Sequence, residues 1–181
     1  YRPMLGRVTA ERTIPALRQF VVNGGTVITI GASSTNLARH FALPIADHLV
    51  EDGKPLPAAK FYAPGSVMTA KLDVTHPIAH GMNERTDVFF DTSPVFRLEP
   101  TAASQGVKAF AWFDSAAPLK SGWAWGQQYL QNGVAALEAP MGKGRVLLFG
   151  PEIMKRAQPH GTFKFLFNGL YYAAADPAPS R

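Results

Sequence analysis

The order of apolar and polar residues predicts a helix, a strand and a second helix at the start of the chain. Residues 14–22 carry apolar side chains at helical spacing, and an Asn-Gly-Gly sequence ends this helix. Its buried face is predicted to consist of Ile14, Leu17, Phe20 and Val21. The β-branched run at residues 26–30 predicts a buried strand. After a short turn, residues 35–41 form the second predicted helix, with a hydroxyl cap.

The rest of the chain predicts shorter strands and one closing helix. Prolines make residues 44–65 irregular. Further strands are predicted at residues 66–73, 88–90, 95–98 and 107–113. A hairpin spans residues 133–149, with its turn at a Gly-Lys-Gly sequence. The last helix follows Thr162 as its cap, and its apolar face is predicted to consist of Phe163, Phe167, Leu170 and Tyr171.

Together these elements predict one α/β domain over residues 1–175. Within this domain, an irregular and β-rich section, mostly antiparallel, is inserted at residues 44–125. The polar tail at residues 176–181 is predicted to be disordered.

Composition limits the chemistry more than the fold. The chain has 181 residues, of which 46% are apolar, and this length is enough for a buried core. It contains no cysteine, which excludes disulfides, thiolate zinc sites and cysteine nucleophiles. The net charge is +5, but the basic residues are scattered, so nucleic-acid binding is not expected. No apolar run reaches the ~18 residues of a membrane span, so none is predicted.

Polar residues after the predicted strand at residues 145–149 form the first candidate site. They are Arg156, Gln158, His160 and Thr162. Ligands of open α/β sheets bind beyond the carboxyl ends of the strands, and a helix N-terminus attracts anions. We therefore expect these residues to line a ligand pocket. The alternative is that His160 packs under the loop and Thr162 only caps the helix.

The turn that follows residues 26–30 is the second candidate site. It contains Ala32, Ser33 and Ser34 and lies where a strand meets a helix, which is where hydrolases of this class carry a nucleophile. A small-molecule or carbohydrate-acting serine hydrolase, using Ser33 or Ser34 with His160 as its base, is therefore an alternative function. The competing interpretation is that both serines cap the helix.

Two histidines four residues apart, His76 and His80, have the spacing of metal ligands on a helix. Pro77 and Gly81 favour a turn instead, and the glutamate of the zinc-protease pattern is missing. We therefore expect no metal site in this chain, and we expect His76 to bond to a backbone carbonyl.

Five longer segments carry a family resemblance. They are LRQFVVNGGTVITIGASSTNLARHFALP, FYAPGSVMTAKLDVTHPIAHGM, VFFDTSPVF, SGWAWG and GKGRVLLFGPEIMKRAQPHGTFKFLFNGLYYA. Over about residues 11–174, the chain resembles the C-terminal region of bacterial secreted zinc carboxypeptidase-like proteins. In these proteins a carboxypeptidase A-like domain precedes a domain similar to class I glutamine amidotransferases. The resemblance implies a flavodoxin-like, three-layer sandwich of the amidotransferase type, of which this chain is the C-terminal portion without the first βα units.

The resemblance assigns no catalytic residue to this chain. The zinc-binding and catalytic residues of the peptidases match nothing here, so zinc is expected only in the peptidase domain of the parent protein. The amidotransferase cysteine corresponds to a position on or near Ala32, and His160 lacks the His-x-Glu context of the family. The resemblance therefore implies a non-catalytic ancillary domain, serving docking, substrate presentation or ligand binding for the peptidase part.

The same resemblance implies where the chain works and with what. Its partners would be the peptidase domain and the N-terminal half of its own parent chain, with a homo-oligomer as the alternative. Its location would be secreted or periplasmic, and it would need no cofactor of its own.

Overall fold

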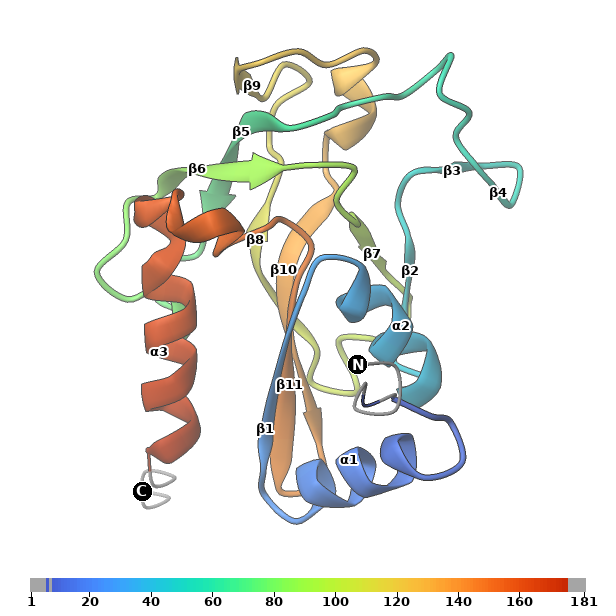
Figure 1. Cartoon of the computed structure of the whole chain (residues 1–181), viewed down its shortest axis with the longest axis vertical. Coiled ribbons are helices and arrows are strands. Elements are labelled where there is room, and N and C mark those ends of the chain that lie inside the picture. Colours follow the sequence, from blue (N-terminus) through green and yellow to red (C-terminus); the bar gives the residue numbers. More distant parts are fainter. Residues whose placement is uncertain (1–5, 7, 176–181) are drawn as a thin grey trace.

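The computed structural model describes residue 6 and residues 8–175 (Figure 1). The predicted tail at residues 176–181 lies outside these described residues. The α-helices are α1 (Thr13–Val22), α2 (Ala32–Phe41) and α3 (Phe163–Ala174). In the part of the chain that the structure describes, no helix combines the length and the apolar character that crossing a membrane requires.

The strands form a nine-stranded sheet and a small separate hairpin. The main strands, in their order across the sheet, are β1 (Thr26–Ile30), β11 (Gly144–Phe149), β10 (Val134–Met141), β8 (Lys108–Trp112), β5 (Ser66–Leu72) and β6 (Arg85–Phe90). Beside them lie β2 (Ile45–Asp47), β7 (Phe96–Leu98) and β9 (Leu119–Ser121). The separate hairpin consists of β3 (Val50–Glu51) and β4 (Lys54–Pro55). Short 3₁₀ turns are η2 (Pro77–Ala79), η3 (Gln127–Leu130), η4 (Lys155–Ala157) and η5 (His160–Thr162).

The sheet is mixed, with one parallel pair at its end. β1 runs parallel to β11, with Thr26 opposite Arg145 and Ile30 opposite Phe149. The other pairs among the described strands are antiparallel, including the predicted β10–β11 hairpin. The α/β class predicted from the sequence is confirmed. The section at residues 44–125 supplies β5, β6 and β8 to the same sheet as β1 and β11.

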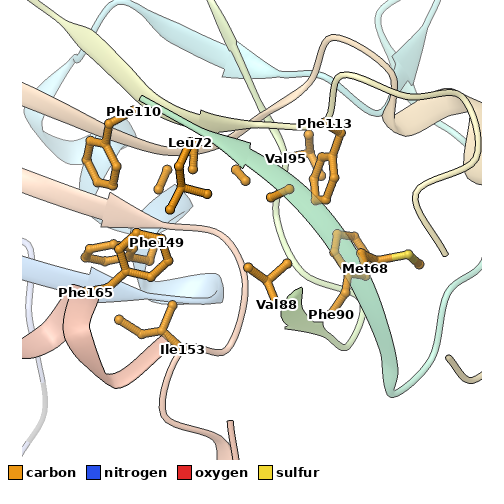
Figure 2. Packing of buried hydrophobic residues seen from close by; sticks show 14 of the residues in the cluster. Met68, Leu72, Val88, Phe90, Val95, Phe110, Phe113, Phe149, Ile153 and Phe165 are labelled. Carbon is orange, nitrogen blue, oxygen red and sulfur yellow. The ribbon is translucent and has the colours of Figure 1, made fainter. Parts of the chain in front are cut away.

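Alternate residues of β11 face two hydrophobic cores, as the two-residue period of a strand requires. Val146 and Leu148 belong to the core beneath α1 and α2, whereas Leu147 and Phe149 belong to the core beneath α3. Figure 2 shows part of this second core, where Phe149 lies against Phe165 of α3 with ring centroids 5.3 Å apart. The parallel pair therefore has helices on both of its faces.

The apolar face predicted for α3 is wrong for most of its residues. The exposed members, which we call the outer stripe, are Phe167, Leu170 and Tyr171, at 51%, 53% and 77% exposure. The buried side of the helix carries Phe165 and Gly169 instead. Gly169 decides this orientation, because without a side chain it lets the helix approach Ile28 and Leu147. A Cβ at Gly169 would lie 3.0 Å from the Ile28 Cδ1 atom.

Two further expectations for the first elements need correction. Phe20 is 53% exposed, although Ile14 and Val21 of the same predicted face are buried. The sequence predicts a buried strand for β1, yet Thr29 is the one of its five residues that is buried, and the other four are half-buried. The reason is that β1 is the last strand of the sheet, so one of its edges has no neighbouring strand among the described residues.

Candidate functional site

The carboxyl ends of β1 and β11 meet at one edge of the sheet because the two strands are parallel. Gly31 follows β1 directly and has φ +61° and ψ −139°, a conformation that only glycine adopts readily. Glu152 follows β11, and a Cβ at Gly31 would overlap its Oε1 atom. At this strand-to-helix turn, a carboxylate thus occupies the space that the side chain of a nucleophile would need.

The two serines of this turn bond to backbone rather than to a catalytic partner. The Ser33 hydroxyl donates to the Ile30 carbonyl at 2.7 Å and accepts from the Ile30 N–H at 3.1 Å. The buried Ser34 donates to the Phe149 carbonyl at 2.8 Å. α2 begins at Ala32 rather than at residue 35, and neither hydroxyl caps it, which corrects the expected cap. Among the described residues, neither serine forms a hydrogen bond with a histidine.

A cleft of about 830 Å³ lies between β6, the segment after η2 and the loop that leads into α3. Gln158 and His160 line it, as predicted, but Arg156 and Thr162 do not. Arg156 is exposed at φ +47°, and this left-handed backbone is followed by a second one at Ala157, at φ +54°. Consecutive left-handed residues other than glycine are strained, and such strain is concentrated at functional sites in proteins.

Thr162 and His160 both contact backbone carbonyls of the loop that forms one wall of the cleft. Thr162 is fully buried, and its hydroxyl lies 2.6 Å from the Ile153 carbonyl and 2.9 Å from the Pro159 carbonyl. These bonds fasten the loop. The prediction that the Thr162 side chain caps α3 is wrong, because its hydroxyl forms no capping hydrogen bond with the helix. The His160 ring lies beside Phe163, with centroids 5.1 Å apart, and its Nε2 atom is 3.1 Å from the Ala157 carbonyl.

Three cations line the cleft, and each has a partner. Arg85 pairs with Asp114, and Lys155 pairs with Asp91 at 3.1 Å. Lys164 donates to the Gly81 carbonyl. Lys164 is therefore the lining cation that forms no ion pair within the described part of the chain.

The Lys155–Asp91 ion pair should make the stability of the fold sensitive to acid. The hydrogen bond from Lys155, helped by the Gly65 N–H, holds the pKa of Asp91 below its ordinary value. The pair therefore stabilises the fold above the ordinary aspartate pKa of about 3.9, and this contribution is lost as the pH falls through the lowered pKa. We expect Asp91→Asn to reduce the loss of stability between pH 5 and pH 3 in urea unfolding. Asp52→Asn is the control, because Asp52 forms no ion pair among the described residues.

Sequence reasoning missed Glu152, Lys155 and Lys164. Glu152 and Lys155 carried a usable signal, because they lie within six residues of the carboxyl end of β11, and ligands of open α/β sheets bind beyond the carboxyl ends of strands. Lys164 carried none, because its place in the cleft depends on how α3 packs against the segment after η2.

His76 forms part of a buried polar cluster rather than a metal site. Its Nδ1 atom accepts from the Ile78 N–H at 3.3 Å, which corrects the expected bond to a carbonyl. Its Nε2 atom lies 3.0 Å from Glu138, which also binds Arg145 at 3.3 Å. The Arg145 guanidinium lies 4.0 Å above the centre of the Tyr172 ring. Over residues 6 and 8–175, no three His, Asp or Glu side chains gather in a way that could hold a metal ion.

Comparison with known proteins supports the fold and leaves the family open. No family model and no curated protein sequence matches the chain. A β-galactosidase from Bacillus circulans is similar in structure, with a TM-score of 0.56, 12% identity and 92% of this chain covered. The chain spans about a fifth of that enzyme's length, namely 21%.

Two smaller proteins are also similar in structure. One, from Thermoplasma acidophilum, is proposed to be part of a GMP synthase, with a TM-score of 0.53, 10% identity and 90% of this chain covered. The other is a ThuA-like protein from Bacteroides uniformis, with a TM-score of 0.50, 11% identity and 97% covered. The match covers 64% and 69% of these two chains. At such identities the likeness establishes an α/β fold that this chain has in common with them.

Proposed function

We propose that this chain is a non-catalytic ancillary domain of a secreted zinc carboxypeptidase-like protein. In this proposal its fold is the C-terminal portion of an amidotransferase-like, three-layer sandwich, and helices on both faces of the β1–β11 pair support that interpretation. Zinc would belong to the peptidase domain of the parent protein, which would be secreted or periplasmic. The role of this chain would be to dock against that protein and to hold a ligand or substrate for it.

The turn after β1 is the observation that carries the non-catalytic assignment. A nucleophile there would need a side chain at the strained position, but Gly31 has none and Glu152 fills the space. Ser33 and Ser34, the nearest hydroxyls, are held by the carbonyls of Ile30 and Phe149. Acyl transfer at this turn would need a nucleophile hydrogen-bonded to a base. The hydroxyls of Ser33 and Ser34 bond to backbone groups instead, and among the described residues neither bonds to the Glu152 carboxylate.

The cleft beside His160 is the proposed ligand site. Its lining contains three cations, namely Arg85, Lys155 and Lys164, and one acid, Asp87. Because Lys164 donates only to a carbonyl, its ammonium group can bind an anion without losing a carboxylate partner. A peptide with a free C-terminal carboxylate fits both this chemistry and a carboxypeptidase parent.

A turnover assay and a binding assay test this function. We expect the purified chain to show no carboxypeptidase, glutaminase or esterase turnover. Turnover abolished by His160→Ala would overturn the proposal.

We also expect a short peptide with a free C-terminus to shift the NMR signals of the cleft residues at millimolar concentration. The same peptide with a C-terminal amide should shift them much less. Lys164→Gln should weaken this binding several-fold, and Lys108→Gln, at an exposed position of β8, should leave it unchanged.

A further inference from the structure

The outer edge of β1 presents unpaired backbone groups. The Arg145 N–H bonds to the Gly25 carbonyl, and the Gly31 N–H bonds to the Phe149 carbonyl. In a parallel pair, alternate residues of a strand bond to the neighbour, so these two bonds determine which residues of β1 face β11. Odd-numbered residues of β1 therefore bond to β11, and the N–H and C=O groups of Thr26, Ile28 and Ile30 point away from it.

The backbone N–H and C=O groups of Ile30 already have a hydrogen-bond partner. The Ser33 hydroxyl accepts from the Ile30 N–H and donates to the Ile30 carbonyl. At the carboxyl end of β1, these backbone groups are therefore not open to another strand. Thr26 and Ile28 have no partner on this side among the described residues. Buried unpaired backbone is costly, and an exposed edge of this kind is a template for another strand.

The helices beside this edge also leave apolar surface uncovered. Successive helix residues are 100° apart, and Gly169 marks the direction in which α3 touches β1 and β11. Asn168 bonds to the Ile78 carbonyl of η2, so it marks the flank that faces the middle of the sheet. Leu170 then lies on the opposite flank, towards the open edge of β1. From there the outer stripe continues around the helix.

The second face of the sheet shows the same incomplete cover. Phe20 and Val22, near the end of α1, are 53% and 37% exposed. A helix that is apolar on nearly all sides, as α3 is, is normally buried on all sides. A strand alone would pair with Thr26 and Ile28, but it would leave both helices uncovered. The missing partner must therefore bring a strand and helices together.

We propose that an α/β segment of the same polypeptide continues the sheet beyond β1. This inference rests on the proposed function, in which the chain is part of a larger protein. The segment supplies a strand parallel to β1 that bonds to Thr26 and Ile28, and its crossover helices cover the outer stripe and the end of α1. A parallel strand follows from the surroundings, because the β1–β11 pair already has helices on both faces, as parallel sheets do.

Two observations favour such a segment over a second copy of this chain. The similar GMP synthase-like and ThuA-like chains extend well beyond the match, which uses 64% and 69% of their lengths. A second copy would also bring together two chains that each carry a net charge of +5.

Hydrogen exchange, resolved by residue, tests this inference on the 181-residue chain and on the longest natural polypeptide that contains it. In the shorter chain, the Thr26 and Ile28 amides should exchange at least about 100-fold faster than those of Val27 and Thr29. In the longer polypeptide, all four should be protected alike. Fast exchange of Thr26 and Ile28 in the longest natural polypeptide overturns the inference. Protection in the shorter chain that rises with self-association, measured by sedimentation, overturns it in favour of a dimer.

A matched pair of substitutions gives a second measurement. Leu170→Glu should lower the thermal midpoint of the longer polypeptide by about 5 °C and shift that of the 181-residue chain by less than about 1 °C. Val74→Glu, at an exposed apolar residue outside the outer stripe, should shift neither. Equal effects of Leu170→Glu in both polypeptides would contradict the inference. The turnover assay of the proposed function is independent of both measurements, so the two proposals can fail separately.

Discussion

Replacing Phe165 with alanine should lower the free energy of unfolding by about 3–5 kcal/mol. Phe165 is 1% exposed, and its ring centroid lies 5.3 Å from that of Phe149 and 6.1 Å from that of Phe110 (Figure 2). Truncation would remove the contacts of this ring with the sheet and would leave a cavity beside the rings of Phe110 in β8 and Phe149 in β11. Urea unfolding of the purified chain measures the effect.

Phe167 provides a matched control in the same helix. It is 51% exposed and belongs to the outer stripe, so Phe167→Ala in the isolated chain should cost less than about 1 kcal/mol. The two variants can be compared directly, because both replace phenylalanine with alanine in the same helix, two positions apart. If Phe167→Ala were the more costly of the two, the orientation of α3 described above would be wrong.

Replacing Glu138 with alanine should cost about 2–3 kcal/mol, because its carboxylate joins His76 and Arg145 beneath α3. The side chains of His76 and Glu138 are only 7% and 12% exposed. The His76 ring is also stacked on Phe110, with centroids 4.7 Å apart, so it cannot turn to water without disturbing the core. Removing the carboxylate leaves the imidazole N–H and the guanidinium without their partner.

Glu84→Ala is the control for this prediction. Glu84 pairs with Lys71 at 3.3 Å on the surface, where the two side chains are 64% and 36% exposed. Exposed pairs contribute little, so this substitution should cost less than about 1 kcal/mol. Equal losses for the two variants in urea unfolding would show that the cluster around Glu138 adds no more than an ordinary surface pair.

Local patterns were sufficient to predict most of the elements. The spacing of apolar residues gave α1 to within one residue, and the Gly-Lys-Gly turn gave the β10–β11 hairpin. The same spacing misplaced the buried face of α3, because a glycine at position 169 counts as neutral in a periodicity argument. In the fold this glycine is the contact point, since its lack of a side chain allows close approach to Ile28.

Only part of the candidate site could be predicted, because its second wall comes from a part of the chain that is distant in sequence. Gln158 and His160 were found because they follow the carboxyl end of a strand, where ligands of open α/β sheets bind, and both line the cleft. The other wall of the cleft comes from β6, about seventy residues earlier in the chain, and it pairs with β5 rather than with β11. No local pattern connects Arg85 with Lys164, because their proximity depends on the order of strands across the sheet. Glu152 lies against Gly31 because of another long-range pairing, that of β1 with β11.

The parallel pairing of β1 with β11 also has a consequence for the time course of folding. The Thr29 hydroxyl donates to the Leu147 carbonyl across 118 positions of sequence, so the pair closes a very long loop. Closing such a loop costs roughly 4 kcal/mol of chain entropy, and few contacts offset this cost until the intervening strands are in place. The antiparallel strands between residues 66 and 149 should therefore assemble first, with β1, α1 and α2 docking afterwards. Such a high contact order is typical of chains that fold in milliseconds to seconds rather than microseconds.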